Sequence, residues 1–180
     1  MIKKDKIVIG IVGNAGSGKS EVAKVFRKHG ALVISADNLG WKLLKDSSIK
    51  KYLVNKYGCE ILDCNDEIDR KSLRGLVFKN IEHRLYLNKI VHPALKKMIR
   101  REIDRSKKRV VVLDAALLFD WRIARWFDWT ILVTAPKRSK IDRLVSKGLT
   151  RELAERMLAA QMADEIAKRK TDFIIDNNGS

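Results

Sequence analysis

The chain has 180 residues, of which 46% are hydrophobic and 33% are charged. This composition supports a folded core and lies outside the range of disordered proteins, and the length is that of one domain. Lys and Arg (38) outnumber Asp and Glu (22) by 16. The positive charge therefore favours an anionic partner: a polyphosphate ligand, a nucleic acid or a membrane surface.

Membrane and secretory classes are excluded by the apolar pattern. No apolar run approaches the roughly 20 residues that a membrane-spanning helix needs. Residues 1–6 lack the apolar segment of a secretory leader. The two cysteines, Cys59 and Cys64, build no disulfide scaffold, and without a nearby pair of His they form only half of a zinc site. We expect a cytoplasmic protein without a membrane partner.

Short apolar runs alternate with helical patterns along the chain. The runs predict strands at 6–12, 32–34, 110–114, 129–133 and 173–175. Helices are predicted at 21–29, at 136–147 and from Thr150 onward. Residues 38–108 read as mostly helical, broken at 57–69, with Pro93 expected to end or kink a helix. The alternation predicts an α/β fold with a five-stranded parallel sheet and helices on both faces.

The connection after the first strand carries the most specific motif. Gly13-Asn14-Ala15-Gly16-Ser17-Gly18-Lys19-Ser20 matches the P-loop pattern Gly-x-x-x-x-Gly-Lys-Ser/Thr between a predicted strand and a predicted helix. Its glycines let backbone N–H groups converge on a phosphate, and the lysine reaches the β- and γ-phosphates. A glycine-rich turn that binds nothing is the alternative. We expect ATP to be bound by Gly13, Ala15, Gly16, Ser17, Gly18, Lys19, Ser20 and Glu21.

Two carboxylates lie at or just past the ends of predicted strands, at the sheet edge where ligands bind. Asp114 ends the third strand and, with the Ser20 hydroxyl, is a candidate ligand of Mg²⁺. Asp37 follows the second strand. It is either the base that accepts the proton of an attacking hydroxyl or the N-cap of the next helix.

One further helix carries basic residues that suit phosphoryl transfer. Arg143 and Lys147 are four residues apart and are predicted to share a helix face. That face is either a solvated surface or a lid that neutralises charge on the transferred phosphoryl group.

The sequence resembles the dephospho-CoA kinase family over essentially its whole length. Beyond the P-loop, the similarity is carried by short elements in a fixed order: Val33-Ile34-Ser35-Ala36-Asp37, Ile68-Asp69-Arg70, Leu87 to Pro93, Leu113 to Phe119, Arg143-Leu144, Gly148-Leu149-Thr150, Ala160-Gln161 and Asp172 to Asn177. Many families share the P-loop, so the order of the Asp37, His92-Pro93 and Gln161 elements is the more specific signal.

This resemblance implies transfer of the γ-phosphate of ATP to the ribose 3′-hydroxyl of dephospho-CoA, the last step of coenzyme A synthesis. Asp37 matches the acidic residue placed to deprotonate that hydroxyl. Arg143 matches a lid-region arginine at the nucleotide, and Asn177 matches a loop near the adenine. Lys19, Asp37 and Arg143 are therefore the expected catalytic residues.

The resemblance also implies an organisation within a single P-loop kinase domain over 1–180. The helical residues 38–108 match the region that receives the acceptor, where Arg70 and His92 are candidate contacts together with Asp37. Residues 138–168 match the lid.

Several positions depart from the family pattern. Glu21 replaces a threonine, which leaves only its backbone N–H for a phosphate. Ala116 replaces a proline, Asp120 a glutamate and Lys147 an arginine. Family chains continue with another helix where this one stops at Ser180, so we expect a short variant or a trimmed chain.

Two other functions fit parts of the sequence. A P-loop kinase of another small acceptor, such as a nucleoside, nucleotide or shikimate-like alcohol, would share the P-loop and lid but would not need Asp37, His92 and Gln161. A P-loop ATPase that binds nucleic acid would suit the charge. The densest basic stretch, 96–109, contains no aromatic residue, so we expect no nucleic-acid partner.

Overall fold

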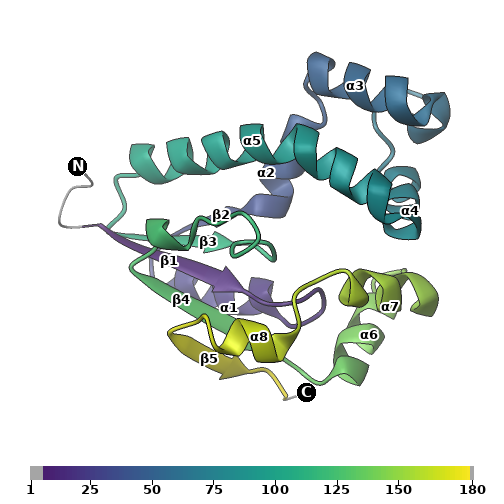
Figure 1. Ribbon diagram of the computed structural model, residues 1–180. Coiled ribbons are helices and arrows are strands. Elements are labelled where there is room, and N and C mark those ends of the chain that lie inside the picture. Colours follow the sequence, from purple (N-terminus) through teal and green to yellow (C-terminus); the bar gives the residue numbers. More distant parts are fainter. Residues whose placement is uncertain (1–5, 179–180) are drawn as a thin grey trace. The chain divides into compact units, whose positions relative to one another are not determined.

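The computed structural model describes residues 6–178. Residues 1–5 of the N-terminal segment and the chain end at Ser180 lie outside this range. The strands are β1 (Ile7–Val12), β2 (Leu32–Ser35), β3 (Val110–Asp114), β4 (Trp129–Thr134) and β5 (Phe173–Asp176). The helices are α1 (Lys19–Lys28), α2 (Ala36–Leu43), α3 (Ser47–Tyr57), α4 (Arg70–Lys79), α5 (Ile81–Arg105), α6 (Lys137–Val145), α7 (Arg151–Ala159) and α8 (Asp164–Lys168) (Figure 1). Two short 3₁₀ turns are η1 (Cys59–Ile61) and η2 (Ala124–Trp126).

The chain divides into two compact units. One comprises the residues up to Ala36 and from Arg100 onward, and the other comprises Asp37–Ile99. The first unit contains the sheet, whose order is β2-β3-β1-β4-β5 with every neighbouring pair parallel. The predicted α/β class and all five strands are confirmed, with strand ends within one residue of the expectation.

Apolar residues line both faces of this sheet, which is why its inner strands read as continuous apolar runs. On one face, Ile11, Val112 and Val133 pack with Ala23 of α1. Side chains alternate along a strand, so Thr134 points to the opposite face, where it contacts α8 through Asp164. Helices α1 and α8 therefore contact opposite faces of the sheet.

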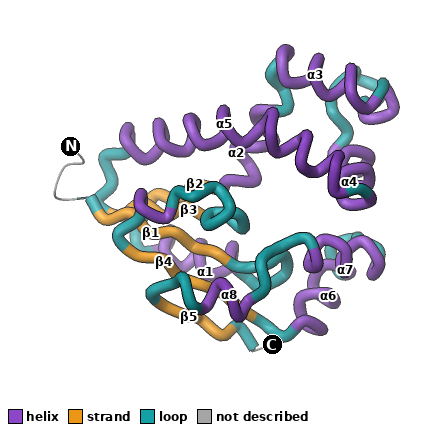
Figure 2. Tube along the Cα trace, in the orientation of Figure 1, coloured by secondary structure: helices purple, strands orange, loops and turns teal. Residues whose placement is uncertain are grey.

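The Asp37–Ile99 unit is built from helices joined by loops (Figure 2). Asp46 caps α3 by accepting from the amides of Ser48 and Ile49, and Asp69 caps α4 by accepting from Ser72. The predicted break at 57–69 is confirmed, because α3 ends at Tyr57 and α4 begins at Arg70.

Two helix boundaries differ from the sequence-based expectation. Pro93 is expected to end or kink a helix, and it does not end one, because α5 continues through it to Arg105; a kink at Pro93 stays a prediction. Proline removes only one hydrogen bond, and the rest of the 25-residue helix is retained. Helix α6 ends at Val145, so Lys147 lies in the turn beyond it and does not share a helix face with Arg143. Gly148 adopts φ 88° there, a left-handed stop.

Within the described range of 6–178, no helix is both long enough and apolar enough to cross a membrane.

Candidate functional site

The P-loop connects the end of β1 to the start of α1 in the first unit. Gly13 and Gly18 have φ values of 146° and 99°, which other residues rarely adopt. A Cβ on Gly13 would also overlap the carbonyl oxygen of Val133. Lys19, the first residue of α1, folds back and donates from Nζ to the Asn14 carbonyl at 3.2 Å. The loop is therefore held in a tight turn with Lys19 lying across it.

One buried group of the loop has no protein partner. The Oγ of Ser17 is fully buried and makes no hydrogen bond to any part of the chain within 6–178. An unsatisfied buried hydroxyl costs about 1–3 kcal/mol, so it marks a place that a ligand or water can complete.

A serine and a carboxylate meet beside the loop. Ser20 donates from Oγ to Oδ2 of Asp114 at 3.1 Å. The register places Asp114 opposite both Ile11 of β1 and Ser35 of β2, at the carboxyl ends of the strands. The structure thus brings together the two predicted Mg²⁺ ligands from residues 94 positions apart in the chain. Across residues 6–178, no group of three His, Cys, Asp or Glu side chains could hold a metal by itself.

Arg143 contacts the P-loop through backbone carbonyl groups of the loop. Its Nη1 donates to the carbonyls of Gly16 (3.2 Å) and Ser17 (3.4 Å), and its Nη2 donates to the Asn177 carbonyl (3.1 Å). Asn177 in turn donates from Nδ2 to the Ser17 carbonyl at 3.0 Å. Through these contacts, Arg143 links α6, the P-loop and the segment after β5.

Glu21 does not extend the loop. It lies in the first turn of α1, where its amide donates to the Gly18 carbonyl at 2.9 Å and its carboxylate pairs with Lys24 at 2.8 Å. The hydrogen bond and charge of Lys24 lower the pKa of the Glu21 carboxyl. A contact between the Glu21 amide and a phosphate stays a prediction.

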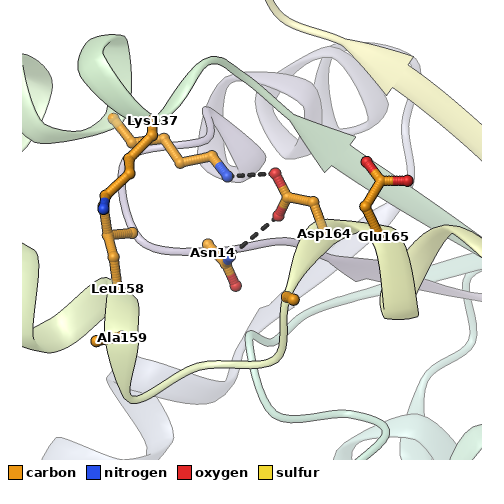
Figure 3. A pocket seen from close by; sticks show the side chains of 8 residues that line it. Asn14, Lys137, Leu158, Ala159, Asp164 and Glu165 are labelled. Carbon is orange, nitrogen blue, oxygen red and sulfur yellow. Dashed lines mark hydrogen bonds and ion pairs between the residues drawn. The ribbon is translucent and has the colours of Figure 1, made fainter.

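Two residues after α7 hold the other side of the loop. Gln161 accepts from the Ala15 amide at 2.8 Å. Asp164 accepts from Asn14 Nδ2 at 3.0 Å and from Thr134 Oγ1 at 2.7 Å, and it pairs with the buried Lys140 of α6 (Figure 3). The residues after α7 therefore fix the first half of the P-loop through side-chain contacts.

A pocket of about 260 Å³ opens beside this network. Asn14, Lys137, Asp164 and Glu165 are among the side chains that line it (Figure 3). Sequence reasoning assigned no role to Asp164 and Lys140. A lysine on a polar helix normally faces solvent, so nothing in the sequence indicated that Lys140 is buried against a carboxylate.

The remaining candidates lie in the Asp37–Ile99 unit. Asp37 is in the first turn of α2 and is exposed. The alternative that it caps α2 is wrong, because the helix already begins at Ala36. Arg70, exposed at the start of α4, stacks on Trp41 with its guanidinium carbon 4.6 Å from the ring centroid.

His92 lies half-buried on α5. Burial, with a smaller contribution from the charge of Lys96, lowers the pKa of His92 to about 4. Its imidazole is therefore neutral near pH 7, so it can accept or donate a hydrogen bond but does not supply positive charge.

The cysteines lie outside this group of candidates. Cys59 and Cys64 are free and exposed.

Comparisons with known proteins agree on one family. A family model described as dephospho-CoA kinase matches residues 7–180. Dephospho-CoA kinase of Fusobacterium nucleatum is 31% identical over 97% of this chain and 91% of its own length, and that of Corynebacterium diphtheriae is 35% identical over 96% and 89%.

Solved structures give the same result. A crystal structure from Thermus thermophilus has a TM-score of 0.80 at 31% identity, covering 98% of this chain and 91% of the other. The dephospho-CoA kinase of Campylobacter jejuni has a TM-score of 0.66 at 26% identity, covering 96% and 89%. Shikimate kinase of Acinetobacter baumannii, at 12% identity and a TM-score of 0.55, shares the fold alone.

Proposed function

The chain belongs to the dephospho-CoA kinase family, and from that premise we propose that it transfers the γ-phosphate of ATP to the ribose 3′-hydroxyl of dephospho-CoA, giving coenzyme A and ADP. The observation that carries the proposal is a family match over 7–180 in a chain whose P-loop follows β1 and whose Ser20 and Asp114 are in contact.

The P-loop binds the triphosphate of ATP in this proposal. Its glycine-dependent turn directs backbone N–H groups at the phosphates, and the start of α1 adds the positive end of a helix dipole. Lys19 exchanges its contact with the Asn14 carbonyl for the β- and γ-phosphates, where it stabilises negative charge that grows in the transition state. Ser17 Oγ, a buried hydroxyl of this loop without a hydrogen-bond partner among residues 6–178, is a further candidate donor.

The chemistry of Ser20 and Asp114 fits Mg²⁺. Both offer hard oxygen atoms, and Mg²⁺ in kinases is held by one or two protein oxygens with phosphates and waters completing the shell. When bound, Mg²⁺ supplies neutralising charge to the phosphates and orients them.

Asp37 is the proposed base. Its carboxylate takes the proton of the 3′-hydroxyl while the hydroxyl oxygen forms a bond to the γ-phosphorus. The bond from that phosphorus to the bridging oxygen breaks, and ADP leaves with the electron pair. An exposed carboxylate in the first turn of α2 is accessible to an acceptor and is not the N-cap of its own helix.

Arg143 and Asn177 are proposed to act on the nucleotide side. Their hydrogen bonds to Gly16, Ser17 and each other join α6 to the loop that binds ATP in this proposal. Residues 138–168 are proposed as the lid. The helical residues 38–108 are proposed to receive dephospho-CoA, with Arg70 and His92 among its contacts.

An assay of ADP release tests the proposal. Purified protein with Mg-ATP is offered dephospho-CoA, adenosine, a nucleoside monophosphate and shikimate, and the product is identified by mass. We expect turnover with dephospho-CoA and a product heavier by one phosphoryl group. Faster turnover of another acceptor, or retention on RNA at physiological salt without kinase turnover, would assign the chain to one of the other two functions.

A further inference from the structure

An arginine in the Asp37–Ile99 unit is held over an aromatic ring. The guanidinium carbon of Arg70 lies 4.6 Å from the centroid of the Trp41 ring, which joins the start of α4 to α2. Stacking suits arginine because its planar, weakly hydrated group is attracted to the face of an indole. A cation held over a ring is attracted by its charge, so the contact does not use the N–H groups as donors to an oxygen and leaves them for another partner.

Among the described residues, the guanidinium of Arg70 forms no ion pair with a carboxylate of the same unit. The adjacent Asp69 is occupied as the cap of α4, where it accepts from the Ser72 amide at 2.6 Å. Arg74 follows Arg70 by one helical turn, on the same face of α4, and also forms no ion pair within this unit. Two guanidinium groups on one helix face therefore favour an extended anion.

Trp41 also connects this anion site to the proposed base. It follows Asp37 by four residues in α2, so the carboxylate and the indole lie on one face of that helix. Through the stack, the donors of Arg70 are held beside the helix face that carries Asp37.

We propose that Trp41 is a positioning residue, which orients Arg70, with Arg74 beside it, to bind the pyrophosphate of dephospho-CoA. The inference rests on the proposed function, because the acceptor carries its pyrophosphate on the same ribose whose 3′-hydroxyl is phosphorylated. Arginine binds phosphate oxygens through paired N–H groups, and a guanidinium fixed in its plane loses less freedom when it does so.

Steady-state kinetics on Trp41 and Arg70 variants test this. The KM for dephospho-CoA is measured at saturating Mg-ATP, and the KM for ATP at saturating acceptor. Arg70→Ala should raise the KM for dephospho-CoA about 10- to 100-fold, as expected for a lost charged hydrogen-bond donor. Trp41→Ala should raise it about three- to tenfold. The KM for ATP should stay within about twofold in both, since the pair contacts only the acceptor.

A double variant and conservative variants separate positioning from folding. In the Arg70→Ala background, Trp41→Ala should add nothing, because the orienting residue has lost its target. Trp41→Phe keeps an aromatic face and should restore the KM to within about twofold of the unchanged protein. Arg70→Lys should remain impaired, because a point charge cannot stack and bind two oxygens at once.

The matched control is Tyr52→Ala, which removes an exposed aromatic side chain from α3 of the same unit. It should leave the KM for dephospho-CoA unchanged. Additive effects of Trp41→Ala and Arg70→Ala, or an unaltered KM in Arg70→Ala, would overturn the inference while dephospho-CoA turnover by the unchanged protein still supports the function. Absence of that turnover would instead overturn the function.

A further experiment measures inhibition by adenosine, which competes with dephospho-CoA but lacks its pyrophosphate. Its inhibition constant should not change in Arg70→Ala or Trp41→Ala. A weakening equal to that of dephospho-CoA would place the pair on the nucleoside and contradict a pyrophosphate site.

Discussion

Lys19 stands at the start of α1 and reaches back across its own loop to the Asn14 carbonyl. Its charged amine can leave this single neutral acceptor for phosphate oxygens without disturbing the backbone of the turn, which is set by the positive φ values of Gly13, Gly16 and Gly18. The side chain is therefore dispensable for the fold and important for the proposed transfer.

We accordingly expect Lys19→Ala to lower kcat by about 10²- to 10³-fold, the usual effect of removing one charged donor from a developing anion. The melting temperature should change little. Steady-state assays with dephospho-CoA, together with thermal unfolding, measure both effects. Near-normal turnover in a folded variant would contradict the role assigned to the P-loop.

Asp37 differs from Lys19 because its proposed role is to accept a proton, whereas Lys19 stabilises negative charge. Asp37→Asn preserves size and polarity but removes the basic oxygen, so kcat should fall by about 10²- to 10⁴-fold with little change in the KM for dephospho-CoA. The measurement is a full rate-against-acceptor curve at saturating Mg-ATP.

The same unit offers a matched control for that variant. Asp46 caps α3 through Ser48 and Ile49, and Asn caps a helix as well as Asp does, so Asp46→Asn should leave both turnover and stability nearly unchanged. Equal activity of the two variants would show that Asp37 is not the base. Loss of activity with a weakened Mg²⁺ dependence would assign Asp37 to the metal.

Helices α6 and α8 both hold the P-loop in place, through contacts between residues that are far apart in the sequence. Asp164 at the start of α8 joins the loop residue Asn14, Thr134 of β4 and Lys140 of α6. Lys140 is buried, so its charge depends on this carboxylate. Removal of one partner from a buried ion pair is costly, because the other charge is left without compensation.

Asp164→Ala should therefore lower the free energy of unfolding by about 3 kcal/mol, as measured by urea titration. Glu165→Ala is the control next to it: Glu165 forms an exposed pair with Lys168, and such pairs contribute about 1 kcal/mol or less. If the two substitutions destabilise the protein equally, Lys140 does not depend on Asp164.

Helix α6 reaches the other side of the loop with Arg143, which donates to the carbonyls of Gly16, Ser17 and Asn177. Arg143→Ala should raise the KM for ATP about tenfold, because these contacts brace the nucleotide side of the protein. The KM for dephospho-CoA should change much less. The reverse pattern, with the acceptor affected and ATP unaffected, would contradict the assignment of Arg143 to the nucleotide.

For the whole molecule, the excess of 16 positive charges suits two anionic substrates and makes their binding sensitive to salt. Stability carries a separate dependence on pH. Burial lowers the pKa of His92 from 6.5 to about 4. Between these two pH values His92 is protonated in the unfolded chain and neutral in the folded chain.

The sign follows from that difference. The contribution of neutral His92 is fully present above about pH 6.5 and is lost as the pH falls toward about 4. After allowance for its partial exposure, the loss should be about 1–2 kcal/mol. His92→Gln should remove this part of the pH dependence. Urea titrations of both proteins at about pH 7.5 and about pH 4.5 would reveal it, and parallel profiles would refute it.

The sequence alone determined the features that depend on residues near one another in the chain. Apolar runs predicted the five strands, and the spacing of Gly13, Gly18 and Lys19 predicted a P-loop between a strand and a helix. These patterns are local because the strand period, the helix period and the turn glycines each act over a few residues. The positions of Asp114 at the end of one strand and of Asp37 just past the end of another follow from the same logic.

Only the tertiary structure decided which distant side chains meet. Ala15 and Gln161 are 146 positions apart, and Asn14 and Asp164 are 150 apart, so no periodicity connects them. The stack of Trp41 on Arg70 is equally invisible to local patterns. Pro93 shows the same limit, because its local preference to end a helix is outweighed by the rest of α5. Backbone preferences are set locally, whereas burial and pairing of side chains depend on the packing of the folded chain.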